Sequence, residues 1–270
     1  MTDKNEAENY SSRHLPDYLI IGTQKGGSTS LYNYLIKHPD ILPSSKKELH
    51  FFDKMENYKK GIGWYQKQFS FPISSNQKKI TGEATPNYLS DSLAPKRIAR
   101  DLPKTTKFIV LLRNPIDRAY SNYQMNVKRG LEQCSFEEAI VNNEKRLKDK
   151  FSHITRTHKK QGADQWVYPY ITRGVYIKQL KTWMKLFSKN QFLILKSEDL
   201  FSKPQKVVNR AIQFLELDEN KLNLEMFDIY HKGKYSDEMS QKTRNILVDY
   251  YRPYNQSLEK LLDMKFNWDH

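Results

Sequence analysis

The sequence predicts an α/β fold in which helices flank a central parallel sheet on both faces. Three observations lead to this class. Short apolar runs that suit buried strands recur at residues 18–21, 107–113 and 191–196. Helical patterns separate these runs along the chain, and strands that alternate with helices are typical of parallel sheets. A glycine-rich turn follows the first run directly, as in the loops that connect a strand to a ligand-binding helix.

Length and composition indicate one folded domain over residues 15–270, preceded by a flexible polar tail at residues 1–14. The mean hydropathy is −0.80, so we expect a polar surface. No stretch approaches the roughly 18 apolar residues of a membrane span, and the N-terminus lacks a signal-peptide core. We therefore expect a soluble, cytoplasmic protein. The only cysteine, Cys134, excludes an intramolecular disulfide and suits a reducing compartment.

The chain is strongly basic. Forty-five Lys and Arg residues against 31 Asp and Glu residues give a formal net charge of +14. Such a balance favours polyanionic partners, which include nucleic acid, anionic membranes, sulfated glycans and nucleotides. Charge alone does not choose among them.

The first strand is followed by a candidate phosphate cradle. Gly26 and Gly27 let the backbone turn sharply, and a helical pattern opens at Ser28, so that a helix N-terminus points at the same spot. Gly22 and Gly27 match the two glycines of a P-loop, but Ser28 stands where a nucleotidase carries lysine. Lys25 lies inside the loop instead. The plain alternative is a glycine turn with a solvated lysine.

The next motif is Lys46-Lys-Glu-Leu-His-Phe-Phe-Asp53, which follows a helix stop at His38-Pro39. Two lysines, a carboxylate, an imidazole and two aromatic rings lie within eight residues. Such a cluster can hold and tune a general base. In the alternative interpretation, Phe51 and Phe52 pack in the core and the charged side chains are solvated.

The central part of the chain predicts two further strands. A short strand at Ile80 runs into a polar turn closed by Pro86, and helical spacing returns from Ala94 to Leu102. The apolar run of residues 107–113 is the clearest buried strand. Arg113 stands at its carboxyl end, where open α/β sheets bind ligands, and Ser121 lies two turns along the following helix.

The remaining chain alternates between charged and amphipathic stretches. Residues 128–165 are the most charged; we expect a helix over 135–147 with Ser135 as its N-cap, and a candidate mobile lid over 145–165. The usual meaning of such a charge run is a solvated face. Further helices are expected over 173–183, 203–215 and 240–262, the last interrupted near Pro253. Residues 231–235 form a basic glycine turn.

Three stretches at suitable spacing resemble the sulfotransferases that use 3′-phosphoadenosine 5′-phosphosulfate (PAPS). They are the loop Gln24-Lys-Gly-Gly-Ser-Thr-Ser30, the turn Arg113-Asn-Pro-Ile-Asp-Arg-Ala-Tyr-Ser121, and Lys232-Gly-Lys234. The segment Glu48-Leu-His-Phe-Phe-Asp53 is similar to the heparan sulfate 3-O-sulfotransferase branch and its bacterial single-domain relatives. The resemblance covers roughly residues 17–268 and implies a P-loop-like three-layer fold and a sulfotransferase activity.

The resemblance also implies roles for individual residues in binding PAPS and its product PAP. The 5′-phosphosulfate would be held by Lys25, Gly26, Gly27, Ser28, Thr29 and Ser30. Arg113 and Ser121 would bind the 3′-phosphate, which suits a guanidinium fork and a hydroxyl. The nucleotide would be covered from its other side by Lys232, Gly233 and Lys234.

Catalysis would involve Glu48 as general base, Lys25 at the bridging oxygen, and His50. Acceptor contacts would come from Lys47, Asp53 and Glu83. The sulfuryl group carries little charge to neutralise, so no metal ion is expected. The acceptor would be a hydroxyl or, as the second choice, an amine.

One departure bears on the acceptor. The glycosaminoglycan branch commonly carries lysine after the glutamate that corresponds to Glu83, whereas this chain has Ala84. The membrane anchor and the cysteine pair typical of Golgi enzymes are also missing. Both points argue against heparan sulfate and leave a bacterial glycan, a lipid or a small natural product.

Two other classes remain as alternatives. The charge of +14 would suit a nucleic-acid- or polyanion-binding protein with a degenerate P-loop. A P-loop kinase is disfavoured by Ser28 in the position of the Walker lysine. With the sulfotransferase interpretation we expect a carbohydrate or small-molecule acceptor as the partner, no nucleic acid, no membrane span, and a monomer.

Overall fold

The computed structural model describes residues 15–69, 79–141, 170–222 and 239–269. The predicted tail, the candidate lid and the basic turn with Lys232, Gly233 and Lys234 lie outside the described residues. Contacts divide the chain into two compact units, Met1–Leu112 with Thr182–Tyr230 and Arg113–Lys181 with His231–His270. A single domain over residues 15–270 stays a prediction.

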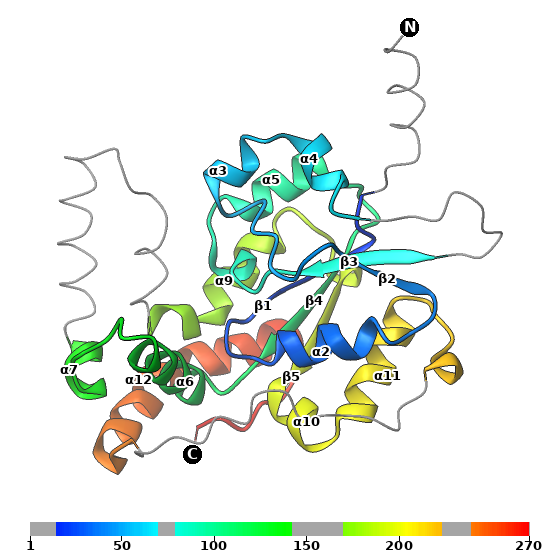
Figure 1. The fold of residues 1–270 in the computed structure, drawn as a ribbon. Helices are drawn as coiled ribbons and strands as arrows, with labels where there is room; N and C mark the ends of the chain where they lie inside the picture. Colours follow the sequence, from blue (N-terminus) through cyan, green and yellow to red (C-terminus); the bar gives the residue numbers. More distant parts are fainter. Residues whose placement is uncertain (1–14, 70–78, 142–169, 223–238, 270) are drawn as a thin grey trace, which may run out of the picture. The chain divides into compact units, whose positions relative to one another are not determined.

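The first unit is built on a five-stranded parallel sheet (Figure 1). Its strands are β1 (Tyr18–Gly22), β2 (Ile41–Pro43), β3 (Ile80–Ala84), β4 (Lys107–Leu112) and β5 (Phe192–Lys196). Their order is β2-β3-β1-β4-β5, so β1 lies in the middle, with Tyr18 opposite Gly82 on one side and Lys107 on the other. All residues of β1 and β3 are buried, as expected for central strands covered on both faces. The α/β prediction is confirmed.

One face of the sheet is covered by α2 (Ser28–Leu35) and α11 (Pro204–Phe214), which lie side by side in Figure 1 and contact each other. Side chains from all five strands and both helices form one apolar cluster here, which includes Ile20, Ile41, Ile80, Ile109, Leu195, Leu31, Leu35, Val208 and Ile212. The helices reach the sheet because their apolar residues recur at helical spacing. This cluster forms the first inter-layer core.

The opposite face carries an aromatic cluster. Successive residues of a strand point to opposite faces, so Phe108 lies on the other side of the sheet from Ile109. The Phe108 ring contacts Trp183, Phe187 and Phe192 at centroid distances of 5.3, 4.6 and 5.1 Å. The indole N–H of Trp183 donates to the Leu89 carbonyl oxygen at 3.2 Å. The sheet is therefore the middle of three layers.

Short elements complete the first unit. They are α3 (Met55–Tyr58), α4 (Ile62–Gln66), η1 (Tyr88–Ser90), α5 (Ala94–Asp101), η4 (Lys189–Gln191), α10 (Ser197–Ser202) and η5 (Glu219–Lys221). Neither β2 nor α10 was predicted from the sequence. Each has at most six residues, which is too short to show a period.

The second unit is helical where it is described. It contains α6 (Pro115–Lys128), α7 (Phe136–Val141), η3 (Thr172–Gly174), α12 (Gln241–Leu262) and the residues of α9 (Tyr176–Trp183) up to Lys181. An Arg244–Asp117 ion pair joins α12 to α6. The predicted N-cap is confirmed, because Ser135 Oγ accepts from the Glu138 N–H at 3.2 Å and Glu138 accepts from the Ser135 N–H at 2.9 Å.

Two helix predictions for this unit need correction. The last helix is not interrupted, because α12 runs through Pro253. A proline removes one backbone donor, but α12 buries residues on both sides of it, among them Tyr251 and Asn255, which hold the helix together. The helix expected from Arg173 starts at Tyr176, and Arg173 lies in the preceding 3₁₀ turn.

No helix among the described residues has the length and apolar character that crossing a bilayer requires.

The close approach of β1 and β3 gives a first prediction. A Cβ at Gly82 would lie 2.5 Å from the buried ring of Tyr18. We expect Gly82→Ala to lower the free energy of unfolding by about 1–3 kcal/mol, measured by denaturant titration. The wild-type protein is the comparison. A Gly82→Ala variant as stable as the wild type would contradict the packing described.

Candidate active site

The loop between β1 and α2 needs its glycines. A Cβ at Gly22 would lie 2.6 Å from the Leu89 side chain, and one at Gly26 would lie 2.9 Å from the Leu111 carbonyl oxygen. Gly27 has φ 95°, a left-handed conformation that side chains disfavour. The Thr23 N–H donates to the Leu111 oxygen at 2.8 Å. The loop is therefore closely packed against the end of β4.

This loop has the features of an anion site. The helix α2 carries no side-chain N-cap hydrogen bond and no acidic residue in its first turn. The first N–H groups of a helix have no carbonyl partner within it and lie at the positive end of its dipole. Ser197 Oγ donates to the Gly26 carbonyl oxygen at 2.7 Å, which fixes the turn from the β5 side. Lys25 adds a cation within the same turn, with φ 69°.

The segment of residues 46–53 separates its side chains into two groups. Leu49, Phe51 and Phe52 are at most 1% exposed and belong to the core. Glu48 and His50, by contrast, have φ angles of 60° and 51°, left-handed values that are unusual for such residues. The interpretation that the two phenylalanines pack in the core is thus correct, but the charged side chains of the segment are paired with each other and not simply solvated.

The charged side chains form a connected row. Lys47 Nζ donates to Glu48 Oε1 at 2.5 Å. The other carboxylate oxygen of Glu48 lies 3.5 Å from His50 Nε2. His50 Nδ1 is 2.7 Å from Asp53 Oδ2, and the Asp53 side chain is fully buried. Glu48 is the member that reaches solvent most, with 39% of its side chain exposed.

The row shifts two pKa values in opposite directions. Burial raises the pKa of Glu48, but hydrogen bonds from His50 and Lys47 outweigh it and lower this pKa to about 2. Burial lowers the pKa of His50, while hydrogen bonds to Asp53 and Glu48 outweigh it and raise this pKa to about 9. At neutral pH, Glu48 is therefore ionised and His50 is protonated.

Glu83 lies behind this row, at the end of β3, and is fully buried. Its carboxylate accepts hydrogen bonds from the Tyr65, Tyr88 and Thr85 hydroxyls and from the Leu49 N–H. Burial raises the pKa of Glu83, and these donors oppose the shift. The Glu83 carboxylate is thus already engaged with groups of the protein, and its contact with an acceptor stays a prediction.

The structure brings together Lys47, Glu48, His50 and Asp53. The Asp53 side chain is fully buried and contacts His50, and its contact with an acceptor stays a prediction. Lys25 and residues 26–30 lie in the same unit, on the loop and the first turn of α2. Sequence reasoning missed the hydroxyls of Thr85 and Tyr88, although polar side chains directly after a buried strand could have signalled them.

The remaining predicted residues belong to the second unit. Arg113 follows the last residue of β4, and its carbonyl oxygen accepts from the Tyr176 hydroxyl at 2.9 Å. Asn114 caps α6 by accepting from the Ile116 N–H at 3.0 Å. Ser121 lies within α6 and is 2% exposed.

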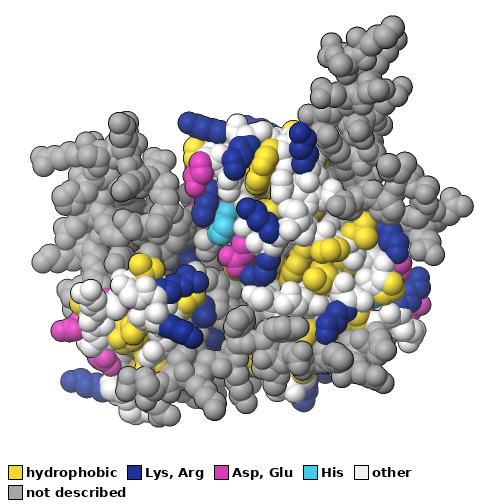
Figure 2. Space-filling model, viewed as in Figure 1, with side chains coloured by type: hydrophobic (Ala, Val, Ile, Leu, Met, Phe, Trp, Pro, Cys, Tyr) yellow, Lys and Arg dark blue, Asp and Glu magenta, His cyan; other side chains and the backbone are white. Residues whose placement is uncertain are grey.

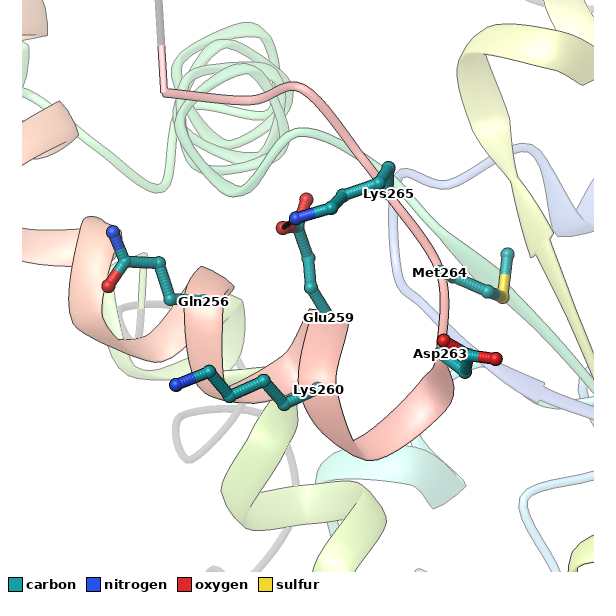
Figure 3. A pocket seen from close by; sticks show the side chains of 6 residues that line it. All are labelled: Gln256, Glu259, Lys260, Asp263, Met264 and Lys265. Atoms are coloured by element: carbon teal, nitrogen blue, oxygen red, sulfur yellow. Dashed lines mark hydrogen bonds and ion pairs between the residues drawn. The ribbon is translucent and has the colours of Figure 1, made fainter.

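A surface pocket of about 510 Å³ lies elsewhere, at the C-terminal end of α12 (Figure 3). It contains none of the predicted site residues, and its Glu259 is already paired with Lys265 at 3.1 Å. Within the described parts of the chain, no group of three or more His, Cys, Asp or Glu side chains is arranged to hold a metal ion.

The basic charge is spread out on the face drawn in Figure 2, where the described Lys and Arg side chains stand at many separate places. Several ion pairs involve such residues, including Lys221–Asp40 at 2.9 Å and Lys107–Glu216 at 2.7 Å.

The fold and the site together define an α/β protein in which a glycine-rich loop leads from a central strand into a helix, with an ionised glutamate in the same unit. Residues 15–258 match the family described as sulfotransferase domain, and the chain belongs to this family. It is 28% identical to the membrane-associated sulfotransferase kil1 of Dictyostelium discoideum, over 94% of this chain and 66% of that protein. It is 33% identical to the mouse bifunctional heparan sulfate N-deacetylase/N-sulfotransferase 4, over 92% of this chain and 30% of that protein.

A solved structure agrees with these relatives. The crystal structure of a sulfotransferase from Alicyclobacillus acidocaldarius superposes with a TM-score of 0.78 at 26% identity, covering 95% of this chain and all of the other. The chain spans about two thirds or less of the curated relatives named above. The predicted family and fold are confirmed.

The charged row predicts a particular pH dependence. The fold raises the pKa of His50 from 6.5 to about 9, so its contribution to stability is complete below pH 6.5 and is lost as pH rises through 9. We expect NMR titration of the histidine C2 protons to place His50 near 9 and Asp53→Asn to move it toward 6.5.

Lys47→Gln is the matched control, because Lys47 contacts the Glu48 oxygen that does not face His50. It should not lower the pKa of His50. A wild-type His50 that titrates near 6.5 would contradict the row of ion pairs.

Proposed function

We propose that this protein transfers the sulfuryl group of PAPS to a hydroxyl, or alternatively an amine, of a carbohydrate, lipid or small natural product, with Glu48 as general base. The observation that carries the proposal is the ionised Glu48, held by Lys47 and His50 in the same unit as the glycine loop. Membership of the sulfotransferase domain family supports it, since PAPS is the usual donor of that family.

The glycine loop suits the 5′ end of the nucleotide. Any side chain at Gly26 would meet the Leu111 carbonyl, so glycine is needed there for the loop to pack against the end of β4. Lys25 and the N–H groups of residues 27–30 would hold the 5′-phosphosulfate, whereas the Gly26 N–H donates to the Thr23 carbonyl oxygen at 3.0 Å and closes the loop. Arg113 and Ser121 are proposed for the 3′-phosphate, by charge and hydrogen-bonding capacity. When bound, PAPS would supply an activated sulfuryl group on a phosphate leaving group.

The protein's own groups have separable tasks. Lys25 would stabilise negative charge as it develops on the bridging oxygen. Glu48 would take the proton of the acceptor hydroxyl, and protonated His50 would orient the Glu48 carboxylate. Asp53, 2.7 Å from His50, keeps that imidazole protonated and in place.

A carboxylate with a pKa of about 2 is well oriented but weakly basic. Lys47 is one of the two cations that lower this pKa, and 23% of its side chain is exposed, so it can move. We propose that the acceptor hydroxyl takes the place of Lys47 beside Glu48 Oε1. Loss of this cation raises the basicity of Glu48 as the acceptor arrives.

The residue at position 84 bears on the charge of the acceptor. Relatives named as heparan sulfate glucosamine 3-O-sulfotransferases are 28% identical to this chain. Ala84 is fully buried, so this position offers no cation to an anionic sugar. We therefore propose an acceptor less charged than heparan sulfate.

Glu48→Gln tests the base. The amide keeps the shape of the carboxylate but does not accept a proton, so we expect kcat to fall by about 10²- to 10⁴-fold. Binding of PAP, measured by calorimetry, should stay nearly unchanged. Glu56→Gln is the control, because it makes the same change at an exposed glutamate of α3 that is not part of the charged row. Unchanged turnover in Glu48→Gln would refute the assignment.

The transfer itself is tested with ³⁵S-labelled PAPS and acceptor fractions from the source cell, separated into glycans, lipids and small molecules. We expect label to enter one fraction and to depend on Glu48. Failure of every fraction to take up label, by a protein that binds PAP, would contradict the proposed acceptor classes.

A further inference from the structure

Four consecutive backbone N–H groups of the Glu48 segment point to the end of β3. The Glu48 N–H donates to the Ala84 carbonyl oxygen at 3.2 Å. The Leu49 N–H donates to Glu83 Oε2 at 3.4 Å, and the His50 N–H donates to Thr85 Oγ1 at 3.3 Å. The Phe51 N–H donates to the Tyr88 hydroxyl at 3.0 Å. Each of these four consecutive N–H groups therefore has a hydrogen-bond acceptor among residues 83–88.

The two hydroxyls that accept from the segment, those of Thr85 and Tyr88, both donate a hydrogen bond to the Glu83 carboxylate. Thr85 Oγ1 donates to Glu83 Oε2 at 2.6 Å, and the Tyr88 hydroxyl donates to Glu83 Oε1 at 2.8 Å. Three N–H groups in a row thus end on Glu83, one directly and two through a hydroxyl. Hydrogen bonds that run in one direction polarise each other and strengthen in a buried environment.

We propose that Glu83 is the positioning residue of the active site, the common acceptor that holds residues 48–51 in the backbone conformation that presents Glu48 and His50. The role in catalysis rests on the proposed function of Glu48; the role in holding the segment does not.

The conformation needs such an acceptor because Glu48 and His50 are both left-handed, with φ angles of 60° and 51°. Non-glycine residues keep this conformation only where the surroundings impose it. On the carbonyl side, Asn57 Nδ2 donates to the Leu49 and His50 oxygens, at 3.1 Å each. The two peptide units around His50 are thereby fixed on both sides.

A carboxylate suits this position better than any other side chain. Glu83 receives four donors on two oxygens, and it is fully buried. A glutamine offers one acceptor oxygen and an NH₂ group, which would face either the hydroxyl of Thr85 or those of the two tyrosines. An amide would therefore reverse at least one of the hydrogen-bond chains.

A comparison of Tyr65 with Tyr88 distinguishes a positioning role of Glu83 from a purely structural role. Tyr65 and Tyr88 both donate to Glu83 Oε1, at 2.7 and 2.8 Å, and both are fully buried. Only Tyr88 also accepts from the Glu48 segment. Tyr65→Phe and Tyr88→Phe thus remove equivalent hydroxyls from Glu83, but only the second cuts a chain to the segment.

The experiment compares these variants in the full-length protein by thermal unfolding, by kcat and KM for PAPS, and by NMR titration of His50, assigned with His50→Gln. We expect Tyr88→Phe to lower kcat by roughly 10- to 100-fold, the scale of a reacting group displaced by about 1 Å. Its His50 pKa should move from about 9 toward 6.5, with KM for PAPS unchanged. Tyr65→Phe should change neither the His50 pKa nor kcat appreciably.

Thr85→Val and Thr85→Ser provide the second pair, should Tyr88→Phe unfold. Valine removes the chain from the His50 N–H, and serine restores it. We expect the His50 pKa to fall in the valine variant and to recover in the serine variant.

Equal effects of Tyr65→Phe and Tyr88→Phe, or no rescue by serine, would overturn the positioning role. The His50 pKa does not depend on the reaction, so this result is separate from the fate of the proposed function. If Glu48→Gln keeps full turnover while the His50 pKa follows the expected pattern, the base assignment fails and the positioning of the segment stands.

Discussion

The interaction on which the rest of the site depends is the hydrogen bonding between the end of β3 and the segment that follows β2. A parallel sheet places the carboxyl ends of its strands at one edge, and here the backbone of residues 48–51 lies against that edge. The strand supplies the buried Glu83 carboxylate and the Ala84 carbonyl, and the residues that follow it supply the hydroxyls of Thr85 and Tyr88. Without these acceptors, we expect Glu48 and His50 to leave their left-handed backbone conformations, and their side chains would lose the contact with each other.

The same arrangement explains a conflict between orientation and basicity. Two cations hold the Glu48 carboxylate firmly, and the cost is a pKa of about 2. A general base must be oriented toward the proton that it accepts. Efficient proton transfer also needs a base whose pKa is closer to the working pH than the value of about 2 for Glu48. We propose that the partly exposed Lys47 leaves when the acceptor binds, which would raise the pKa of Glu48 while His50 keeps the carboxylate oriented.

Sequence patterns predicted the parts of this protein that follow from local periodicity and from glycine. The strands at residues 18–21, 107–113 and 191–196 and the glycine turn were predicted because buried apolar runs and left-handed turns leave direct signatures. Pro253 misled the prediction of the last helix, since packing outweighed a single lost hydrogen bond. The burial of Glu83 was also missed, because the sequence shows a charged residue but not the distant tyrosine that meets it.

The central claim is that this chain binds a nucleotide with a 3′-phosphate, and calorimetry in the presence of EDTA tests it most directly. PAP and ADP differ in where the second phosphate group is attached, and only PAP can use Arg113 and Ser121 as proposed. We expect PAP to bind at least roughly tenfold more tightly than ADP, which corresponds to about 1.4 kcal/mol from charge-assisted hydrogen bonds. Equal affinity for the two nucleotides, or tight binding of ADP that appears only when magnesium is added, would contradict the account.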